Sequence, residues 1–329
     1  MSKLWERSSG KYLGECSRKR LKTKEVRVLF MTYKSGFVSI MGSPNVGKST
    51  LMNTMVGQKI AIATQKAQTT RNKVTGILTR KDYQIIFLDT PGIHTPKNKL
   101  GEYMVKTAYE ANQDVDLTLF VVDATSEAIG KGDRLILDKI IDSKKKCILV
   151  INKVDLVAKE QIAKLIELYS KEYSFTAVVP VSVIKNKNLD ILLDEIENNL
   201  KVGPAYYNVE EYTDQTLRQL AEETIREKTL RLLDQEVPHG IYIEVEKMKF
   251  RKTVEKQSIC DISATIYCLK KSHKGIIIGK DGKMLKRIGT YAREDLEKTL
   301  DTKVNLQLWV KVREDWINDS NLLKKFKLQ

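Results

Sequence analysis

The chain has 329 residues, enough for two domains with their own hydrophobic cores, and its 42% of apolar residues is typical of a globular protein. It has no apolar run near the roughly 18 residues of a membrane span, no apolar signal segment and no zinc-binding spacing of cysteines. These features argue against a membrane-spanning, secreted or zinc-binding protein. The four cysteines, Cys16, Cys147, Cys260 and Cys268, are expected to be reduced thiols in a cytoplasmic protein.

Positive charge is concentrated near the N-terminus. The formal net charge is +15, and residues 1–35 hold 10 Lys and Arg against 3 Asp and Glu. This segment is polar and has no sustained hydrophobic period, so we predict a basic, disordered N-terminal extension, with a nucleic-acid-binding arm as the alternative. A basic surplus favours polyanionic partners, although a solvated lysine-rich surface gives the same sum.

Residues 42–49 read Gly-Ser-Pro-Asn-Val-Gly-Lys-Ser, a full match to the phosphate-binding pattern G-x-x-x-x-G-K-[ST]. A short apolar run at 36–41 precedes the motif and a helical pattern at 50–56 follows it, which is the context that such a loop requires. Backbone N–H groups at the helix N-terminus surround an anion, Lys48 reaches the outer phosphates, and the Ser49 hydroxyl is a Mg²⁺ ligand. A chance glycine-rich turn is the alternative.

Two further motifs that can take part in a nucleotide site follow the phosphate-binding loop in the sequence. A Thr-Thr-Arg triplet at 69–71 lies in a loop where a hydroxyl could close on a bound metal, although threonine pairs are common in loops. An apolar run at 83–88 then leads into Asp-Thr-Pro-Gly. Because open α/β sheets bind ligands at the carboxyl ends of their strands, Asp89 is expected to hold Mg²⁺ and the Gly92 N–H to meet a γ-phosphate.

The apolar run at 147–151 ends in the motif Asn-Lys-Val-Asp, residues 152–155. The Asp155 carboxylate can accept two hydrogen bonds from the N1–H and the exocyclic amine of guanine, a pair of donors that adenine lacks. The motif therefore predicts guanine specificity. A solvated loop after a strand is the alternative.

The first part of the chain alternates strand and helix patterns. Strand-like runs lie at 74–79, 117–122 and 177–181, and an amphipathic helix is expected at 189–200. This alternation predicts an α/β domain with a mainly parallel sheet that is covered on both faces. Gly203-Pro204 interrupts the pattern, and the polar segment 204–213 is predicted to be a linker.

The pattern changes after residue 213. A helix is predicted at 217–233, alternating strands at 241–245 and 262–268, two helices flanking residues 279–282, and a last alternating strand at 304–312. The expected order is α-β-β-α-α-β, a smaller α+β domain.

Residues 279–282 read Gly-Lys-Asp-Gly and lie between two predicted helices. This fits the G-x-x-G loop with which KH domains clamp single-stranded RNA, whereas a plain turn between helices is the alternative. The glycines let a sugar-phosphate backbone approach, and residues 276–278 are expected to line the groove for the bases. The surrounding cations are Lys274, Lys280, Lys283, Lys286 and Arg287.

Residues 42–49, 68–71, 89–92 and 152–155, joined to the G-x-x-G loop, resemble the bacterial Era family in the TrmE-Era-EngA group of translation-factor-type GTPases. The resemblance covers about residues 36–316. It implies a P-loop GTPase domain at 36–203, a linker at 204–213 and a KH domain of the type II order at 214–329. It also implies a slow, monomeric GTPase that binds the 3′ region of small-subunit (16S) ribosomal RNA and assists maturation of the small ribosomal subunit.

The resemblance also implies the site residues. The nucleotide set is Ser43, Asn45, Val46, Gly47, Lys48, Ser49, Thr50, Asp89, Asn152, Lys153, Asp155, Ser182 and Val183. Lys48, Thr70 and Gly92 are expected to be catalytic, Ser49, Thr70 and Asp89 to ligate Mg²⁺, and Asn45 to support K⁺. Asn152 and Asp155 would read guanine, with Lys153 along the base plane. The RNA set is Ile278, Gly279, Lys280, Asp281, Gly282, Lys283, Lys286 and Arg287.

Three departures from the family pattern stand out. Ile93 follows Gly92 and cannot orient water as glutamine does in other GTPases, so hydrolysis should be slow unless RNA, an ion or a partner completes the site. Ser182-Val183 stands where the family usually has Ser-Ala, and the base O6 would meet backbone N–H. The basic residues 1–30 have no counterpart.

Other interpretations remain open. One is an RNA-binding module whose nucleotide-stabilised first domain has negligible turnover. Another is an ATP-driven or metabolic enzyme on the P-loop fold, against which Asp155 argues. Peripheral membrane contact through basic surfaces is a third, and the sequence shows no amphipathic anchor for it. If the two domains are coupled, RNA affinity should differ between the GTP and GDP states.

Overall fold

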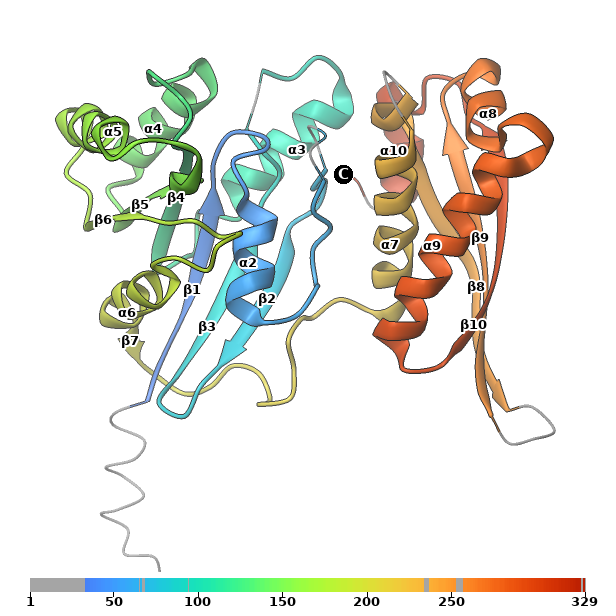
Figure 1. The fold of residues 1–329 in the computed structure, drawn as a ribbon, viewed down its shortest axis with the longest axis horizontal. Coiled ribbons are helices and arrows are strands. Elements are labelled where there is room, and N and C mark those ends of the chain that lie inside the picture. The colour runs from blue at the N-terminus through green and yellow to red at the C-terminus, as the bar shows by residue number, and fades with distance from the viewer. Residues whose placement is uncertain are drawn as a thin grey trace, which may run out of the picture.

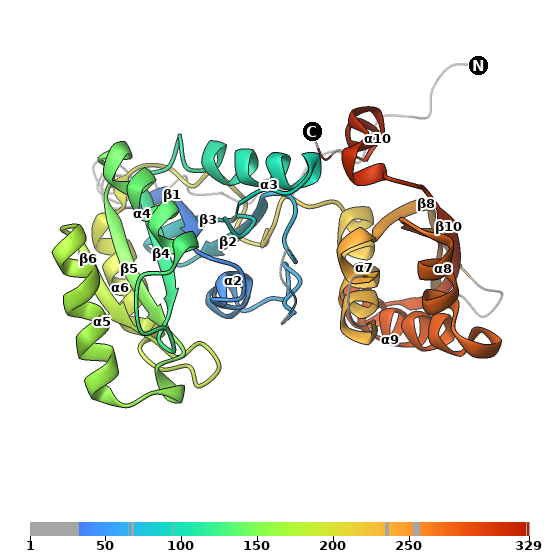
Figure 2. The ribbon, with the colours of Figure 1, turned by 90° about the horizontal axis from the view of Figure 1, so that it is seen from above.

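The computed structural model describes residues 33–64, 66, 69–93, 95–233, 237–252, 257–326 and 328. Residues 1–32 of the predicted basic extension at 1–35, and Gln68, lie outside these residues. The predicted end of the extension at residue 35 is wrong, because Lys34 and Ser35 already belong to strand β1 (Lys34–Met41). An α/β domain and a smaller α+β domain lie side by side, the first in blue to yellow-green and the second in gold to red (Figures 1 and 2).

The first domain is built on a sheet with strand order β2-β3-β1-β4-β5-β6, to which the short β7 adds beside β1. Its strands are β1 (Lys34–Met41), β2 (Val74–Thr79), β3 (Tyr83–Asp89), β4 (Leu117–Asp123), β5 (Cys147–Asn152), β6 (Ala177–Pro180) and β7 (Lys201–Val202). All neighbouring strands pair in parallel except β2 with β3 and β7 with β1. The predicted mainly parallel sheet is confirmed, whereas β7 was not predicted.

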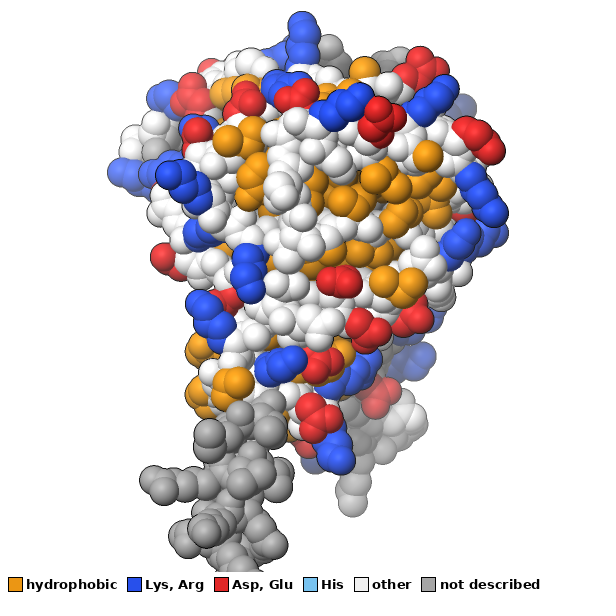
Figure 3. All heavy atoms as spheres, turned by 90° about the vertical axis from the view of Figure 1, so that its left-hand side faces the viewer, with side chains coloured by type: hydrophobic (Ala, Val, Ile, Leu, Met, Phe, Trp, Pro, Cys, Tyr) orange, Lys and Arg blue, Asp and Glu red, His pale blue; other side chains and the backbone are white. Residues whose placement is uncertain are grey.

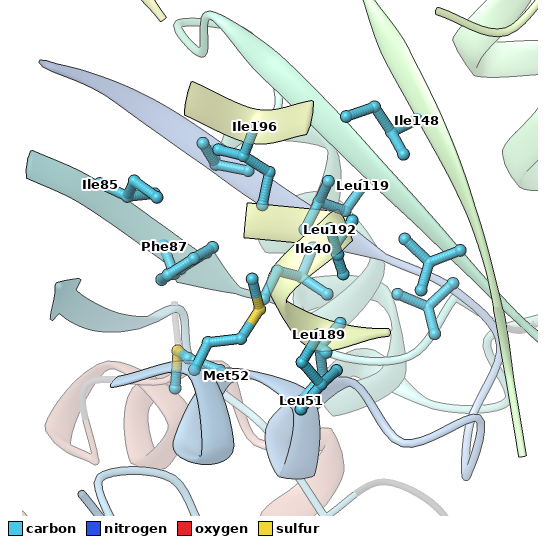
Figure 4. Packing of buried hydrophobic residues seen from close by; sticks show 14 of the residues in the cluster. Ile40, Leu51, Met52, Ile85, Phe87, Leu119, Ile148, Leu189, Leu192 and Ile196 are labelled. Atoms are coloured by element: carbon cyan, nitrogen blue, oxygen red, sulfur yellow. The ribbon is translucent and has the colours of Figure 1, made fainter. Parts of the chain in front are cut away.

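Helices cover both faces of this sheet. They are α2 (Lys48–Val56), α3 (Lys99–Glu110), α4 (Lys131–Ser143), α5 (Lys159–Glu172) and α6 (Leu189–Asn199). Leu51 of α2 and Leu192 of α6 pack with strand residues such as Ile40 on one face (Figure 4). Side chains of α3, α4 and α5 pack with neighbours such as Met41 in a second cluster. Two covered faces explain why these strands are apolar along their whole length.

The two edge strands of the sheet, β6 and β2, have different surroundings. On the side of the molecule that carries the short β6 with α5 and α6, hydrophobic side chains gather in a band (Figure 3). At the other edge, the Ile77 N–H of β2 donates to Tyr212 O at 2.7 Å, and Gln84 Oε1 accepts from Tyr206 N and Tyr207 N at 2.7 and 3.0 Å. The segment after residue 203 therefore occupies part of an otherwise open strand edge.

The second domain packs helices against one face of a three-stranded sheet of order β10-β9-β8. Its helices and strands are α7 (Leu217–Leu232), β8 (Tyr242–Lys252), β9 (Ser258–Cys268), α8 (Lys271–Ile278), α9 (Lys283–Leu300), β10 (Lys303–Val312) and α10 (Ser320–Lys325). Strand β10 runs parallel to β9, and β8 runs antiparallel to it. The predicted α-β-β-α-α-β order is confirmed, and the short α10 was not predicted.

A hydrophobic cluster joins the two domains. Leu100 and Met104 of α3 pack with Trp316, Leu323 and Phe326 of the second domain, and all five side chains are almost fully buried. Figure 2 shows α3 extending toward α10. The described helices include none that is long and apolar enough to cross a membrane.

Candidate functional site

The phosphate-binding loop joins β1 to α2. Gly47 has φ of +102°, and a Cβ atom there would lie 2.4 Å from Asn152 Nδ2, so this position requires glycine. Helix α2 begins at the next residue, so its free N–H groups face the loop. Lys48 Nζ donates to Gly42 O and Ser43 O, both at 2.9 Å, across the hollow of the loop. Burial lowers the pKa of Lys48 to about 8, against the attraction of Asp89 and Asp133.

Three side-chain oxygens converge beside this loop. Ser49 Oγ lies 2.6 Å from Asp89 Oδ2 and 3.0 Å from Thr70 Oγ1, and Thr70 Oγ1 lies 3.3 Å from the same carboxylate oxygen. Asp89 is fully buried, and burial raises the pKa of its carboxyl despite the attraction of Lys48. Oxygens of this kind suit Mg²⁺, and a buried carboxylate at their centre fits a cation. The residues present therefore fit the metal that the sequence predicted.

Gly92 and Ile93 face different surroundings. A Cβ atom on Gly92 would lie 3.0 Å from Pro44, so the backbone after β3 approaches the phosphate-binding loop closely. The Ile93 side chain is 1% exposed and packs in the core with α3, α4 and α5. The side chain that follows Gly92 is thus turned away from the nucleotide site and takes no part in it.

The predicted base-reading residues form a connected set at the ends of β5 and β6. Asn152 Nδ2 donates to Val46 O at 2.8 Å, and Asn152 Oδ1 accepts from Val183 N at 3.2 Å. Ser182 Oγ donates to Asp155 Oδ1 at 2.5 Å, which leaves the other carboxylate oxygen for a ligand. Asn152 thus holds the phosphate-binding loop to the loop at residues 182–183.

One cavity of about 760 Å³ unites these elements. Of the predicted nucleotide, catalytic and metal residues, its lining includes Asn45, Gly47, Lys48, Ser49, Thr50, Thr70, Gly92, Asn152, Lys153, Asp155 and Val183. Ser43, Val46, Asp89 and Ser182 stand behind this lining and hold it through the contacts described here. Arg231 of α7 also lines the cavity, so the second domain contributes to its wall.

Sequence reasoning missed three polar residues that support the site. Ser43 Oγ donates to Asp133 Oδ1 at 2.5 Å, and Tyr169 O–H donates to Asp133 Oδ2 at 3.1 Å. Lys153 Nζ lies 2.5 Å from Asp123 Oδ2. Asp123 ends strand β4, so the rule that found Asp89 could have found it. Asp133 and Tyr169 lie within helices and carry no such signal.

The G-x-x-G loop joins α8 to α9. Gly279 has φ +71° and ψ 175°, and Gly282 has φ +73°, so both adopt conformations that favour glycine. Lys280, Lys283, Lys286 and Arg287 are exposed around the loop, and Asp281 lies 3.8 Å from Lys283. Ile278 is half-buried and Ile276 exposed. Ile277, however, is fully buried in the core, so its predicted place in a base-facing groove is wrong: helical geometry turns it inward.

Comparison with known proteins gives consistent matches for both domains. A family model described as a 50S ribosome-binding GTPase matches residues 37–153, and a KH domain model matches residues 236–317. The GTPase Era of Clostridioides difficile is 54% identical over 295 residues, which cover 89% of this chain and 98% of that protein. The chain belongs to the Era family of GTPases. The GTPase Era of Alkaliphilus metalliredigens is 52% identical over 89% of this chain and 98% of its own length.

Solved Era structures share the whole architecture. A variant of Aquifex aeolicus Era bound to GDP and AlF4⁻ has a TM-score of 0.85 at 39% identity and covers 90% of this chain and 99% of its own. An Era complex with MgGDPNP and nucleotides 1506–1542 of 16S ribosomal RNA has a TM-score of 0.86, with the same identity and coverage. Both domains of this chain therefore have counterparts in Era proteins crystallised with ligands.

Proposed function

We propose that this protein binds and hydrolyses GTP, binds the 3′ region of small-subunit ribosomal RNA through its second domain, and assists maturation of the small ribosomal subunit in the cytoplasm. The observation that carries the proposal is the single cavity that brings Lys48, Ser49, Thr70 and Asp155 together. The Era complex with MgGDPNP and 16S ribosomal RNA supports the choice of ligands. A monomer suffices, since one chain supplies both domains.

The nucleotide would be held by both ends of the cavity. The backbone at residues 43–50 and the Lys48 ammonium would surround the phosphates, while the free oxygen of Asp155 would accept hydrogen bonds from guanine. Lys153 would lie along the base plane. Asn152 would fix the base-reading loop to the phosphate-binding loop, and the backbone N–H groups of Ser182 and Val183 would meet the base O6.

Ser49, Thr70 and Asp89 would hold Mg²⁺, which neutralises charge on the outer phosphates when it is bound. Asp89 acts with Ser49 and Thr70 through hydrogen bonds that fix their hydroxyl groups. The Gly92 N–H would meet the γ-phosphate close to Pro44. Because Ile93 is packed in the core, none of its atoms orients a water molecule, and slow intrinsic hydrolysis follows.

Asn45 is the residue that would support a bound K⁺, and we propose that K⁺ stimulates hydrolysis. It lines the cavity, and its φ of +66° places it in a tight turn of the phosphate-binding loop, from which a carbonyl oxygen could reach a cation. Turnover should be faster in K⁺ than in Na⁺ at equal ionic strength. Equal rates in the two salts would remove this part of the proposal.

The G-x-x-G loop would hold the RNA backbone. Gly279 and Gly282 would allow close approach of the sugar-phosphate chain, and Ile278 would contact the bases. Lys280, Asp281, Lys283, Lys286 and Arg287 would surround the strand, the four cations contributing a salt-dependent attraction to phosphates. RNA affinity should therefore fall as salt increases.

The decisive experiment measures GTP hydrolysis by the full chain with and without an RNA that carries the 3′ end of 16S ribosomal RNA. We expect slow turnover alone, faster turnover with RNA, and loss of the RNA effect in Gly279→Asp. The basal rate of that variant is its internal control, since Gly279 is not among the residues that line the cavity. Absence of multiple-turnover phosphate release in every condition would leave an RNA-binding module with a nucleotide-stabilised first domain.

A further inference from the structure

The loop that carries Thr70 lies between the nucleotide cavity and the second domain. Thr70 Oγ1 faces Ser49 and Asp89, whereas the residues on either side of it bond to the second domain. Thr70 thus faces the nucleotide cavity, while its neighbours Thr69 and Arg71 contact the second domain. Contacts with the cavity and contacts with the second domain together determine where the Thr70 hydroxyl lies.

Arg226 of α7 makes the contact on one side of Thr70. Its Nη2 donates to Thr69 O at 2.5 Å, and its side chain is 3% exposed. On the same helix, Glu223 accepts from Arg226 Nε at 2.9 Å and from Nη2 at 2.5 Å. This ion pair fixes the planar guanidinium in the orientation that meets the Thr69 carbonyl.

Arg71 makes the contact on the other side. It is buried, its Nη1 donates to Ile241 O at 2.5 Å, and its guanidinium carbon lies 5.5 Å from the centroid of the Trp316 ring. Trp316 is fully buried and donates from Nε1 to Gly240 O at 3.0 Å, so the ring itself is fixed. A guanidinium over a fixed tryptophan face is a favourable arrangement.

Two further bonds hold the start of the same loop. Arg231 Nη2 donates to Ala63 O at 3.0 Å, and Lys66 Nζ donates to Leu233 O. The described residues Ala63, Lys66, Thr69 and Arg71 therefore attach this part of the chain to α7, to the segment after it and to Trp316. A loop held before the ligand arrives loses less conformational entropy on binding, which strengthens binding.

We infer that Arg226 is a positioning residue of the nucleotide site: from the second domain it holds the Thr69 carbonyl and, together with the Arg71–Trp316 contact, places the Thr70 hydroxyl beside Ser49 and Asp89. The inference rests on the proposed GTP and Mg²⁺ site. Linkage then requires the reverse effect, so a bound Mg²⁺–triphosphate strengthens the contact between the domains by the same factor.

The test compares Arg226→Ala and Arg226→Lys with Arg218→Ala in the full chain. Arg218 is the matched control, because it lies on the same helix and donates to a backbone carbonyl, Val245 O, within its own domain. The first readout is the affinity for a non-hydrolysable GTP analogue as a function of Mg²⁺ concentration, with GDP affinity alongside.

We expect Arg226→Ala to weaken Mg²⁺-dependent binding of the analogue at least about tenfold, an outer-sphere effect of the usual size, while GDP affinity changes less than about twofold. Arg226→Lys should bind the analogue less weakly than Arg226→Ala, because its ammonium group can still donate to the Thr69 carbonyl although it lacks the planar set of guanidinium donors. Arg218→Ala should match the wild type. Equal losses for GDP and for the analogue would overturn the inference, because they would indicate general damage to the cavity.

The second readout is amide hydrogen exchange over residues 60–71 without nucleotide. Exchange should be faster in Arg226→Ala than in the wild type and unchanged in Arg218→Ala; equal exchange in all three proteins would also overturn the inference. If the wild type binds no GTP analogue, the proposed function fails, whereas the exchange comparison still tests the contact. If Arg226→Ala does not fold, Glu223→Gln replaces it, because it removes the charge that orients Arg226 and should give a smaller loss of the same kind.

Discussion

The Ser49 hydroxyl lies 2.6 Å from Asp89 Oδ2, although 40 positions separate the two residues in the chain. Strands β1 and β3 pair in parallel, so the loop after β1 and the end of β3 meet at the carboxyl ends of the strands. This pairing brings a hydroxyl that can ligate Mg²⁺ to a buried carboxylate that orients it.

Asp89→Asn should therefore weaken Mg²⁺-dependent binding of triphosphate. Asparagine keeps one oxygen for the Ser49 hydroxyl but removes the negative charge, so we expect the Mg²⁺ concentration at half-saturation to rise about tenfold or more. Titration of Mg²⁺ at a fixed concentration of a fluorescent GTP analogue measures it.

Asp82→Asn is the matched control for this prediction. Asp82 is exposed just before β3, at the opposite end of the strand from Asp89. The control should titrate like the wild type. An Asp89→Asn curve that overlays both would show that the carboxylate is not needed to hold the metal.

Asp155→Asn should change base preference. The variant retains Oδ1 as the acceptor for Ser182, so the loop keeps its hydrogen bond. It replaces the other carboxylate oxygen, which would accept from guanine, with an amide NH₂ group that can only donate. Loss of hydrogen bonds to a charged group costs about 1.5–3 kcal/mol, so GTP affinity should fall about ten- to 150-fold. Xanthosine triphosphate, which offers an acceptor in place of the exocyclic amine, should gain affinity.

Competition between the two triphosphates measures this change directly. If the variant lost affinity for GTP without gaining affinity for xanthosine triphosphate, Asp155 would not contact the base. Ser182→Ala serves as the comparison, because it removes the partner of Asp155 and keeps the carboxylate. It should weaken binding of both nucleotides without reversing their order.

The sequence predicted those parts of the site that follow from local rules. Asp89 and Asp155 were found because each follows a buried strand, where a parallel sheet places ligand-binding residues. Asp133 could not be found in this way, since it lies inside α4 and acts only because the fold brings Ser43 and Tyr169 to it. The order of strands and helices was equally predictable, because hydrophobic period encodes it.

Contacts between the domains were beyond the reach of such rules. Arg226 and Thr69 are 157 positions apart, and a single arginine on a helix face is ordinarily a solvated charge. Ile277 shows the opposite error, because three isoleucines in a row gave no sign of which one faces the core. Both depend on packing between distant segments, which one sequence does not encode in a readable pattern.

Gly279→Ala and Gly282→Ala should differ in their cost to stability. At Gly279 a Cβ atom would lie 2.7 Å from Met284 Cβ, and the combination of φ +71° with ψ 175° is nearly restricted to glycine. At Gly282, with φ +73° and ψ 8°, no atom lies within 4 Å of the added Cβ. We expect losses of about 3 and about 1 kcal/mol in the free energy of unfolding, respectively.

Urea unfolding followed by tryptophan fluorescence measures both losses, since Trp309 and Trp316 lie in the second domain. Gly275→Ala is the control, because it is helical, has open space around its Cβ and should be neutral or slightly stabilising. Equal losses at residues 279 and 282 would mean that the loop relaxes around the added methyl group.

Asp133→Asn should stabilise the protein at neutral pH. Burial raises the pKa of the Asp133 carboxyl, although hydrogen bonds from Ser43 and Tyr169 act in the opposite direction. A carboxyl whose pKa is raised on folding contributes stability that is fully present below its ordinary pKa of 3.8 and is lost as the pH rises through the raised pKa. Asparagine is neutral throughout and accepts from Ser43 in the same way, so it avoids this loss.

Urea unfolding between pH 4 and pH 8 measures the effect. The free energy of unfolding of Asp133→Asn should exceed that of the wild type at pH 7, and the difference should shrink as the pH falls toward 4. Asp138→Asn on the exposed side of α4 is the control and should change the free energy of unfolding at pH 7 by little. A constant advantage of Asp133→Asn across this range would show that the charge on the buried carboxylate is not the cause, and a loss of stability at pH 7 would show that the carboxylate does more for Ser43 and Tyr169 than the amide can.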